Sequence, residues 1–155
     1  MSQFKLSQRS LDRLQGVDDR MVSVVKMAIT LSKVDFGVVQ GLRTLEMQKE
    51  LVAKGASQTM KSKHLDGLAV DLMAYVSGRA CWEISVYDEV ADAMAQAADQ
   101  IGVKIRWGAA WTVPDIGAWA SEGKSMEQAM NDYVDTRRSQ GRRPFIDGPH
   151  FELMD

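Results

Sequence analysis

The spacing of hydrophobic residues along the chain predicts a mixture of helices and strands. Apolar side chains recur every three or four positions in several stretches, which is the spacing of an amphipathic helix with one buried face. Helices are expected over residues 21–31, 45–54 and 85–101 and within residues 112–143. Their expected starts carry suitable caps: Asp18, Thr44, Ser85, the pair Thr112 and Pro114, and the capping box that begins at Ser125. Gly55, Gly102 and Gly141 are well placed as helix ends.

Short apolar runs between these helices predict strands. They cover residues 36–39, 68–75, 103–107 and 151–154. Residues 55–67 hold Gly, Ser, Thr and Lys without periodicity and are expected to form a loop. Asp71 stands in the middle of the second apolar run, where an unpaired buried carboxylate would be expensive. With no internal repeat or linker, the chain is expected to fold as one α+β domain over residues 1–155.

Composition narrows the classes of protein that fit. The chain is 45% hydrophobic and 26% charged, as in ordinary globular proteins, and its formal net charge of −2 disfavours nucleic-acid binding. The most apolar stretch, residues 21–31, is too short to span a bilayer, so we expect no stable membrane insertion. Residues 1–14 carry basic side chains but no apolar stretch of signal-peptide length, so synthesis and retention in the cytoplasm are expected.

Two histidines and one cysteine limit the metal sites that the chain can build. Cys81 alone excludes a cysteine-based zinc cluster, so His64 and His150 are the available nitrogen ligands. Gly67 permits a turn that brings His64 back beside Asp71, and a cation there would explain a carboxylate in an apolar run. Together with His150 these residues supply the three ligands that catalytic zinc commonly uses. The alternative is that each histidine is a hydrogen-bonded structural residue.

A carboxylate close to the second histidine is a candidate general base. The bend at Gly148-Pro149 separates Asp147 from His150, so Asp147 can face a water molecule rather than the metal. Asp147 can instead be a turn former before glycine. Glu152 competes for the role of base, because alternation along a strand places residues 150 and 152 on the same face.

These motifs resemble the M15 family of zinc peptidases, which includes D-Ala-D-Ala peptidases of the VanX and VanY type and phage endolysins that cleave L-alanyl-D-glutamate. The family pattern S-x-H-x-x-G-x-A-x-D is matched by Ser62, His64, Gly67, Ala69 and Asp71, and the closing acid-x-x-H by Asp147 and His150. Arg43-Thr44 followed by Gln48 matches an upstream element, and Trp107-Gly108 matches a Trp-Gly element before the last strand. The resemblance covers residues 36–155 in the family's order. It implies a small antiparallel sheet flanked by helices, like that of the DD-peptidases and the hedgehog signalling domain.

The resemblance also implies roles for single residues. It implies a zinc ion on His64, Asp71 and His150, Asp147 as the base, and Arg43 polarising the scissile carbonyl. Substrate contacts are expected at Ser62, Gln48 and Trp107, with Trp107 and Trp111 as a candidate groove for peptidoglycan. Each of these has a structural alternative: Arg43 as a helix cap or partner of Glu46, Ser62 as a loop hydrogen-bonder, and Gln48 and the tryptophans as core.

Two features depart from the family pattern or lie outside it. Many relatives have Glu where Asp147 stands, and residues 112–143 are expected to be a helical insertion at the rim of the site. The run over residues 137–143 contains four arginines, which suit a helix C-terminus or contact with anionic polymers.

The function expected from the resemblance is that of a phage endolysin acting on the L-Ala–D-Glu bond of peptidoglycan stem peptides. The expected protein is a monomer without a separate wall-binding domain, and it reaches the periplasm and wall from the host cytoplasm after a holin opens the inner membrane. The alternatives are a D-Ala-D-Ala carboxypeptidase or dipeptidase of the same family and a non-catalytic zinc-binding module on the same scaffold.

Overall fold

A five-stranded antiparallel sheet organises the part of the chain that this computed structural model describes, residues 4–57 and 59–154. The main path of the sheet is β1 (Asp35–Gln40), β2 (Ala69–Val76), β5 (His150–Leu153) and β4 (Ile105–Trp107), and β3 (Arg79–Cys81) pairs with the far end of β2. All four strand pairs are antiparallel. The expected α+β class with a small antiparallel sheet is confirmed.

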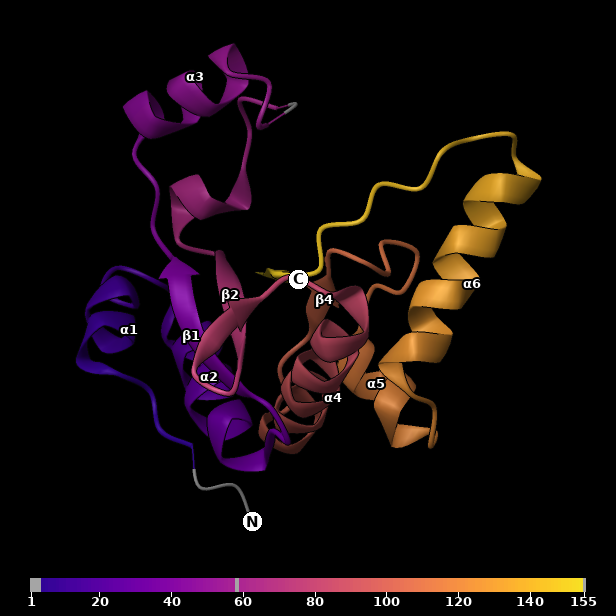
Figure 1. The fold of residues 1–155 in the computed structure, drawn as a ribbon. Helices are drawn as coiled ribbons and strands as arrows, with labels where there is room; N and C mark the ends of the chain where they lie inside the picture. The colour runs from indigo at the N-terminus through magenta and orange to yellow at the C-terminus, as the bar shows by residue number, and fades with distance from the viewer. Residues whose placement is uncertain (1–3, 58, 155) are drawn as a thin grey trace.

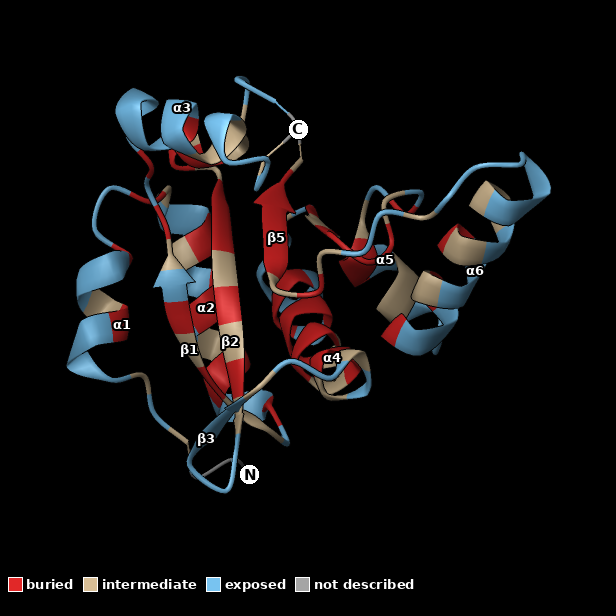
Figure 2. Ribbon diagram, turned by 45° about the horizontal axis from the view of Figure 1, so that its top comes forward, coloured by how far each residue is buried: buried red, intermediate tan, exposed pale blue. Residues whose placement is uncertain are grey.

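Helices flank this sheet and cover one of its faces. They are α1 (Gln8–Arg13), α2 (Asp19–Leu31), α3 (Leu45–Ala53), the 3-10 helix η1 (Lys63–Asp66), α4 (Ile84–Ile101), α5 (Ile116–Ser121) and α6 (Met126–Ser139). In Figure 1, α3 stands at one side of the molecule and α6 at the other. Figure 2 shows α2 and α4 behind the strands, where most buried residues gather. Among the described residues no helix is long and apolar enough to cross a membrane.

The side chains of β2 alternate between the helix-covered face and the open face of the sheet. Val70, Leu72 and Ala74 are fully buried in the core, whereas Asp71 and Met73 are only partly buried. Asp71 therefore lies on the open face of the sheet.

Several expected helix ends are confirmed by their hydrogen bonds. The side chains of Asp18 and Thr44 accept from backbone N–H groups in the first turns of α2 and α3. Ser125 and Gln128 form the expected capping box at the start of α6, and Gly102 ends α4 in the left-handed conformation.

Other boundaries differ from the expectation. Neither Thr112 nor Pro114 begins a helix, since the Asp115 side chain accepts from Ala118 N at 3.1 Å and starts α5 there. The N-cap of α4 is Glu83, so Ser85 lies inside the helix. The short elements α1, β3 and η1 have no periodic signal in the sequence, and η1 lies in the segment expected to be a loop. Residues 1–3 of the N-terminal segment that was expected to lack a signal peptide lie outside the described residues.

A buried carboxyl on α4 carries an unfavourable charge. Asp88 is only 9% exposed, and its Oδ1 atom has no hydrogen-bond partner within the described chain. Burial, together with the negative charges of Glu127, Asp92 and Glu89, raises the pKa of Asp88 to about 6. The folded state therefore binds this proton more tightly than the unfolded state does. Because the proton is lost as the pH rises, ionisation of Asp88 lowers the stability of the folded protein between about pH 4 and about pH 6.

Replacing this carboxyl by an amide is expected to stabilise the protein at neutral pH. Urea unfolding at pH 7.5 should show Asp88→Asn more stable than the wild type by on the order of 1 kcal/mol, and the difference should shrink at pH 5. Asp99→Asn, an exposed site on the same helix, is the control and should leave the stability at pH 7.5 close to that of the wild type. A gain for Asp88→Asn that is equal at both pH values would contradict the assignment.

Candidate metal centre and its cavity

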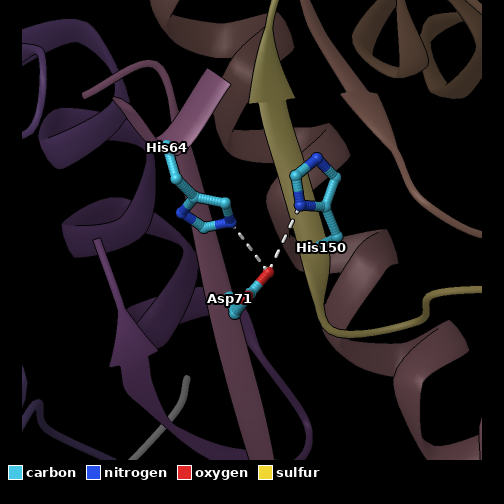
Figure 3. A group of neighbouring side chains, drawn as sticks. All are labelled: His64, Asp71 and His150. Carbon is cyan, nitrogen blue, oxygen red and sulfur yellow. Dashed lines mark hydrogen bonds and ion pairs between the residues drawn. The ribbon is translucent and has the colours of Figure 1, made fainter. Parts of the chain in front are cut away.

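Three side chains from three separate elements converge at one end of the open sheet face. His64 lies on η1, Asp71 on β2, and His150 begins β5. Nε2 of His64 is 3.2 Å and Nδ1 of His150 is 3.3 Å from the same Oδ1 atom of Asp71 (Figure 3). One ligand atom from each residue lies within 4.8 Å of the others. Two imidazole nitrogens and a carboxylate oxygen at this spacing form a group that can hold a metal ion.

Strand register places two of these residues side by side. Asp71 lies directly opposite His150 in the antiparallel ladder, and residues opposite each other in such a ladder share a face of the sheet. Phe151, the next residue of β5, points into the core with no exposed surface. Side chains alternate along β5, so His150 faces Asp71 while the buried Phe151 anchors the strand in the core.

A tight turn brings the third residue to the same point. The Ser62 hydroxyl accepts from His64 N at 3.2 Å, which caps η1, and Gly67 ends η1 with a φ of 71°. A Cβ atom at Gly67 would lie 2.4 Å from the carbonyl oxygen of Gly16, so only glycine fits here. The turn that Gly67 was expected to make is confirmed.

The outer nitrogens of both rings are occupied by partners, and this selects the tautomers. Nδ1 of His64 lies 2.8 Å from the carbonyl oxygen of Gly41, and Nε2 of His150 lies 2.8 Å from Oε1 of Glu152. A carbonyl or carboxylate can only accept, so each of these nitrogens donates. The other two nitrogens, Nε2 of His64 and Nδ1 of His150, face Asp71, and in the neutral rings that bind a metal they would carry the free lone pairs.

The charges of the cluster are strongly coupled. Burial disfavours ionisation of Asp71, but hydrogen bonds from His150 and His64 outweigh it and hold the pKa of Asp71 well below its usual range. Burial likewise opposes the charge on His150, yet its bonds to Asp71 and Glu152 raise the pKa of His150 to about 9. Burial opposes ionisation of Glu152 as well, but His150 and Arg106 lower its pKa to about 2. Without a metal, the His150 ring therefore carries a positive charge, which offsets part of the negative charge of Asp71 and Glu152.

The metal group forms part of the wall of a cavity of about 610 Å³. Asp147 and Arg43 line the same cavity, and Asp147 stands outside the three-residue metal group. Burial, then the negative charge of Asp71, raises the pKa of Asp147, while His150, His64 and Arg43 oppose this rise. A carboxyl with a raised pKa beside a possible metal site is the arrangement expected of a group that exchanges protons.

A glycine at the edge of β4 makes room for the Asp147 segment. Gly108 N donates to the carbonyl oxygen of His150 at 2.8 Å, and Asp147 N donates to the carbonyl oxygen of Gly108 at 2.9 Å. A Cβ atom at Gly108 would lie 2.3 Å from the Asp147 carbonyl oxygen. The Trp-Gly element in the sequence is therefore a requirement for close backbone approach.

Arg43 is held by amide side chains beneath the cavity. It is 8% exposed, its Nη1 donates to Oε1 of Gln48 at 2.7 Å, and its Nη2 lies 3.7 Å from Oδ2 of Asp71. Nε of Arg43 also donates to Gln40 Oε1 at 3.1 Å. Burial lowers the pKa of Arg43, and the charges of Asp71 and Asp147 partly restore it.

Two of the expected substrate contacts lie elsewhere. Trp107 has no exposed surface, does not line the cavity, and donates its indole N–H to the Gly148 carbonyl oxygen at 2.7 Å, so it belongs to the core. Gln48 is also fully buried and contacts Arg43, Ser57 and the Thr59 carbonyl oxygen. It can affect a substrate only through these three neighbours, which line the cavity.

The two remaining candidates, Ser62 and Glu152, both line the cavity. Ser62 lines the cavity, with its hydroxyl 3.4 Å from Nη1 of Arg43. Glu152, the competing candidate for the base, is 5% exposed, and its two oxygens bind His150 and Arg106. It therefore orients His150.

Three cavity residues had little or no signal in the sequence. Arg106 faces the cavity because it alternates with buried neighbours on β4, a pattern visible in the strand run. Trp111 was one of two candidate groove residues, and it is the one that lines the cavity. Phe145 lies in an irregular segment, where no periodicity marks it.

The chain is similar to known proteins over nearly its whole length. The family model described as phage L-alanyl-D-glutamate peptidase matches residues 1–154. The L-alanyl-D-glutamate peptidase of Escherichia phage T5 is 32% identical, over 97% of this chain and 98% of that protein. The crystal structure of the Serratia marcescens L-Ala D-Glu endopeptidase ChiX superposes with a TM-score of 0.71 at 32% identity, covering 97% of this chain and 90% of that one. The chain thus belongs to the phage L-alanyl-D-glutamate peptidase family.

Proposed function

We propose that this protein is a zinc-dependent peptidase that hydrolyses the L-Ala–D-Glu bond in the stem peptides of bacterial peptidoglycan, as an endolysin does. The observation that carries the proposal is the convergence of His64, Asp71 and His150 in a cavity that Asp147 and Arg43 also line. The two relatives, both named for the L-Ala–D-Glu bond, support this choice of substrate.

The donor set suits zinc. Two neutral imidazoles and one carboxylate provide three protein ligands of the nitrogen and oxygen type, and the outer partners Gly41 and Glu152 fix both rings. When bound, zinc lowers the pKa of a water molecule and polarises a carbonyl group. The chain itself supplies the cavity and the oriented ligands.

Asp147 is proposed as the general base and later the general acid. Burial raises the pKa of Asp147, which makes its carboxylate a stronger base. In the proposed reaction Asp147 takes a proton from the attacking water and gives it to the amine of D-Glu that leaves. The Asp147-Gly148 bend and the pairing with Gly108 hold the carboxyl at the cavity wall.

Arg43 is proposed to stabilise the negative charge that develops on the scissile carbonyl oxygen. A guanidinium keeps its proton throughout the reaction, so a fixed one stabilises charge without joining the proton transfers. Gln48 and Gln40 fix it from below, which makes Gln48 a positioning residue. Ser62 is proposed as a substrate contact, because its hydroxyl lines the cavity beside Arg43.

Access to the substrate is part of the proposal. Peptidoglycan lies outside the inner membrane, so we propose that the protein accumulates in the host cytoplasm and reaches the periplasm and wall after a holin opens that membrane. Action as a monomer, the absence of nucleic-acid binding, and the status of residues 112–143 as an insertion stay predictions from the sequence.

Analysis of the reaction products tests the bond that is cut. Digestion of purified peptidoglycan followed by mass spectrometry should reveal new N-terminal D-Glu. Release of D-Ala would instead indicate the D-Ala-D-Ala carboxypeptidase. A protein that binds zinc but releases no peptide would be the non-catalytic module.

Replacing each of the two candidate carboxyls by an amide distinguishes the general base from the residue that orients a metal ligand. Asp147→Asn should lower kcat by about 10²- to 10⁴-fold with the zinc content unchanged, because only the proton transfer is lost. Glu152→Gln should weaken zinc binding by about 10- to 100-fold, and added zinc should restore its activity. Metal analysis and titration of activity with zinc provide the measurements. Rescue of Asp147→Asn by zinc, or failure to rescue Glu152→Gln, would reverse the two roles.

Loss of a metal ligand is expected to remove zinc and activity together. His64→Gln, Asp71→Asn and His150→Gln should each abolish stoichiometric zinc binding, because the chain has no third histidine and only one cysteine that could take the place of a lost ligand. Zinc content by mass spectrometry and the zinc-induced rise in Tm check this without relying on activity. Asp66→Asn, exposed on the same 3-10 helix as His64, should behave as the wild type. Full activity of a zinc-free protein would refute the metal site.

A further inference from the structure

Two neighbouring residues connect the metal cavity to a second groove. Trp111 and Phe145 line both the metal cavity and a groove of about 370 Å³. The groove is also lined by Thr136 of α6 and by Gln140, the residue that caps the C-terminal end of this helix. Figure 1 shows the segment that follows α6 running back towards β5, and Phe145 lies on this segment. The two aromatic side chains thus form a ridge, which we call the aromatic ridge, between cavity and groove.

The exposed member of the ridge is held rigidly. Phe145 is 51% exposed, yet its N–H donates to the Tyr133 hydroxyl and its carbonyl accepts from Nε1 of Trp111, both at 2.9 Å. Its ring stacks on Trp111 with the centroids 6.2 Å apart. An exposed aromatic side chain that is already fixed loses little conformational entropy when a ligand stacks on it.

The far side of Trp111 is tied to the metal group. The Arg106 guanidinium lies 5.0 Å from the centre of the Trp111 ring and donates to Glu152 at 2.8 Å. Trp111 also lies 5.6 Å from the His150 ring, measured between centroids. Within the aromatic ridge, Trp111 therefore lies next to the proposed metal ligand His150, and Phe145 lies one side chain further away.

The proposed substrate requires a sugar close to this place. In peptidoglycan the amino group of L-Ala is joined to the lactyl group of N-acetylmuramic acid, so one residue separates the sugar from the bond that is cut. One extended residue spans only about 3.5 Å. A peptidase that cuts after L-Ala must therefore accommodate a sugar beside its metal centre.

Charge distinguishes the two ends of the cavity. Lys61, on the segment after α3, lines one end and has no ion-pair partner among the described residues. Near the aromatic ridge the cations are already engaged: Arg106 binds Glu152, and Arg137 donates to the Arg143 carbonyl oxygen at 3.0 Å. The lysine end suits the carboxylates of the D-Glu side of the peptide, and the aromatic end suits an uncharged ligand.

We propose that the aromatic ridge is a glycan subsite. The exposed face of Phe145, backed by Trp111, stacks against the N-acetylmuramic acid that carries the stem peptide. The groove along α6 accepts the next sugar of the strand, with Thr136 and Gln140 offering hydrogen bonds to its hydroxyl and acetamido groups. This inference rests on the proposed function, since it assigns the sugar side of the same substrate.

Paired substrates test this subsite. The two substrates are a disaccharide-bearing muropeptide and the same stem peptide, N-acetylated and without sugar. The wild type should cleave the muropeptide with the higher kcat/KM. Phe145→Ala and Phe145→Leu should lower kcat/KM for the muropeptide by about 10-fold and leave that for the free peptide within about 2-fold, because stacking on the ring is lost. Phe145→Tyr should retain the preference.

Controls separate this inference from the proposed function and from loss of folding. Ile146→Ala, at a 40% exposed neighbour that does not line the cavity, should leave both substrates unaffected, and Tm should confirm that every variant is folded. Equal losses on both substrates would show that Phe145 only shapes the active site, and no loss would show that it does not contact sugar. Either result overturns the glycan subsite. If the wild type cleaves neither substrate, the proposed function itself fails.

Discussion

The carboxylate of Asp71 is the group on which the arrangement of the site depends. One of its oxygens meets a nitrogen of each histidine, and the other lies 3.7 Å from Arg43. This geometry rests on the register between β2 and β5, which sets Asp71 directly opposite His150. A slip of one residue would turn His150 into the core and Phe151 onto the open face, so burial of Phe151 fixes the register that the metal group needs.

The same contacts that fix the metal group also shape the substrate-binding surface. His150 binds Glu152, Glu152 binds Arg106, Arg106 covers Trp111, and Trp111 holds Phe145. This continuous series of contacts runs from a candidate ligand to an exposed ring at the rim of the cavity. On the other side, Gly41 and the glutamines under Arg43 play the same part for His64 and the guanidinium. Both histidines and Arg43 are therefore oriented by polar partners.

The sequence allowed the fold class and the long helices to be predicted, because each depends on local patterns, and the family motifs pointed to the grouping of the two histidines with Asp71. Periodicity identifies α2 and α4, and the capping-box residues from Ser125 onwards mark the start of α6. The sequence could not show which polar residues are buried, because that depends on strands from distant parts of the chain. Gln48 and Trp107 match a family pattern equally well whether they face a substrate or the core, and only the packed structure places them in the interior.

The separation of the ligands along the chain has a consequence for folding. Along the sequence α4, α5 and α6 lie between His64 and His150, yet the ring centroids of the two histidines are only 5.3 Å apart. A metal ion bound to both would close a long loop, and the entropy that the unfolded chain loses by such closure grows with loop length. In a chain whose single cysteine cannot form an intramolecular disulfide, the ion would act as the covalent cross-link that the sequence lacks.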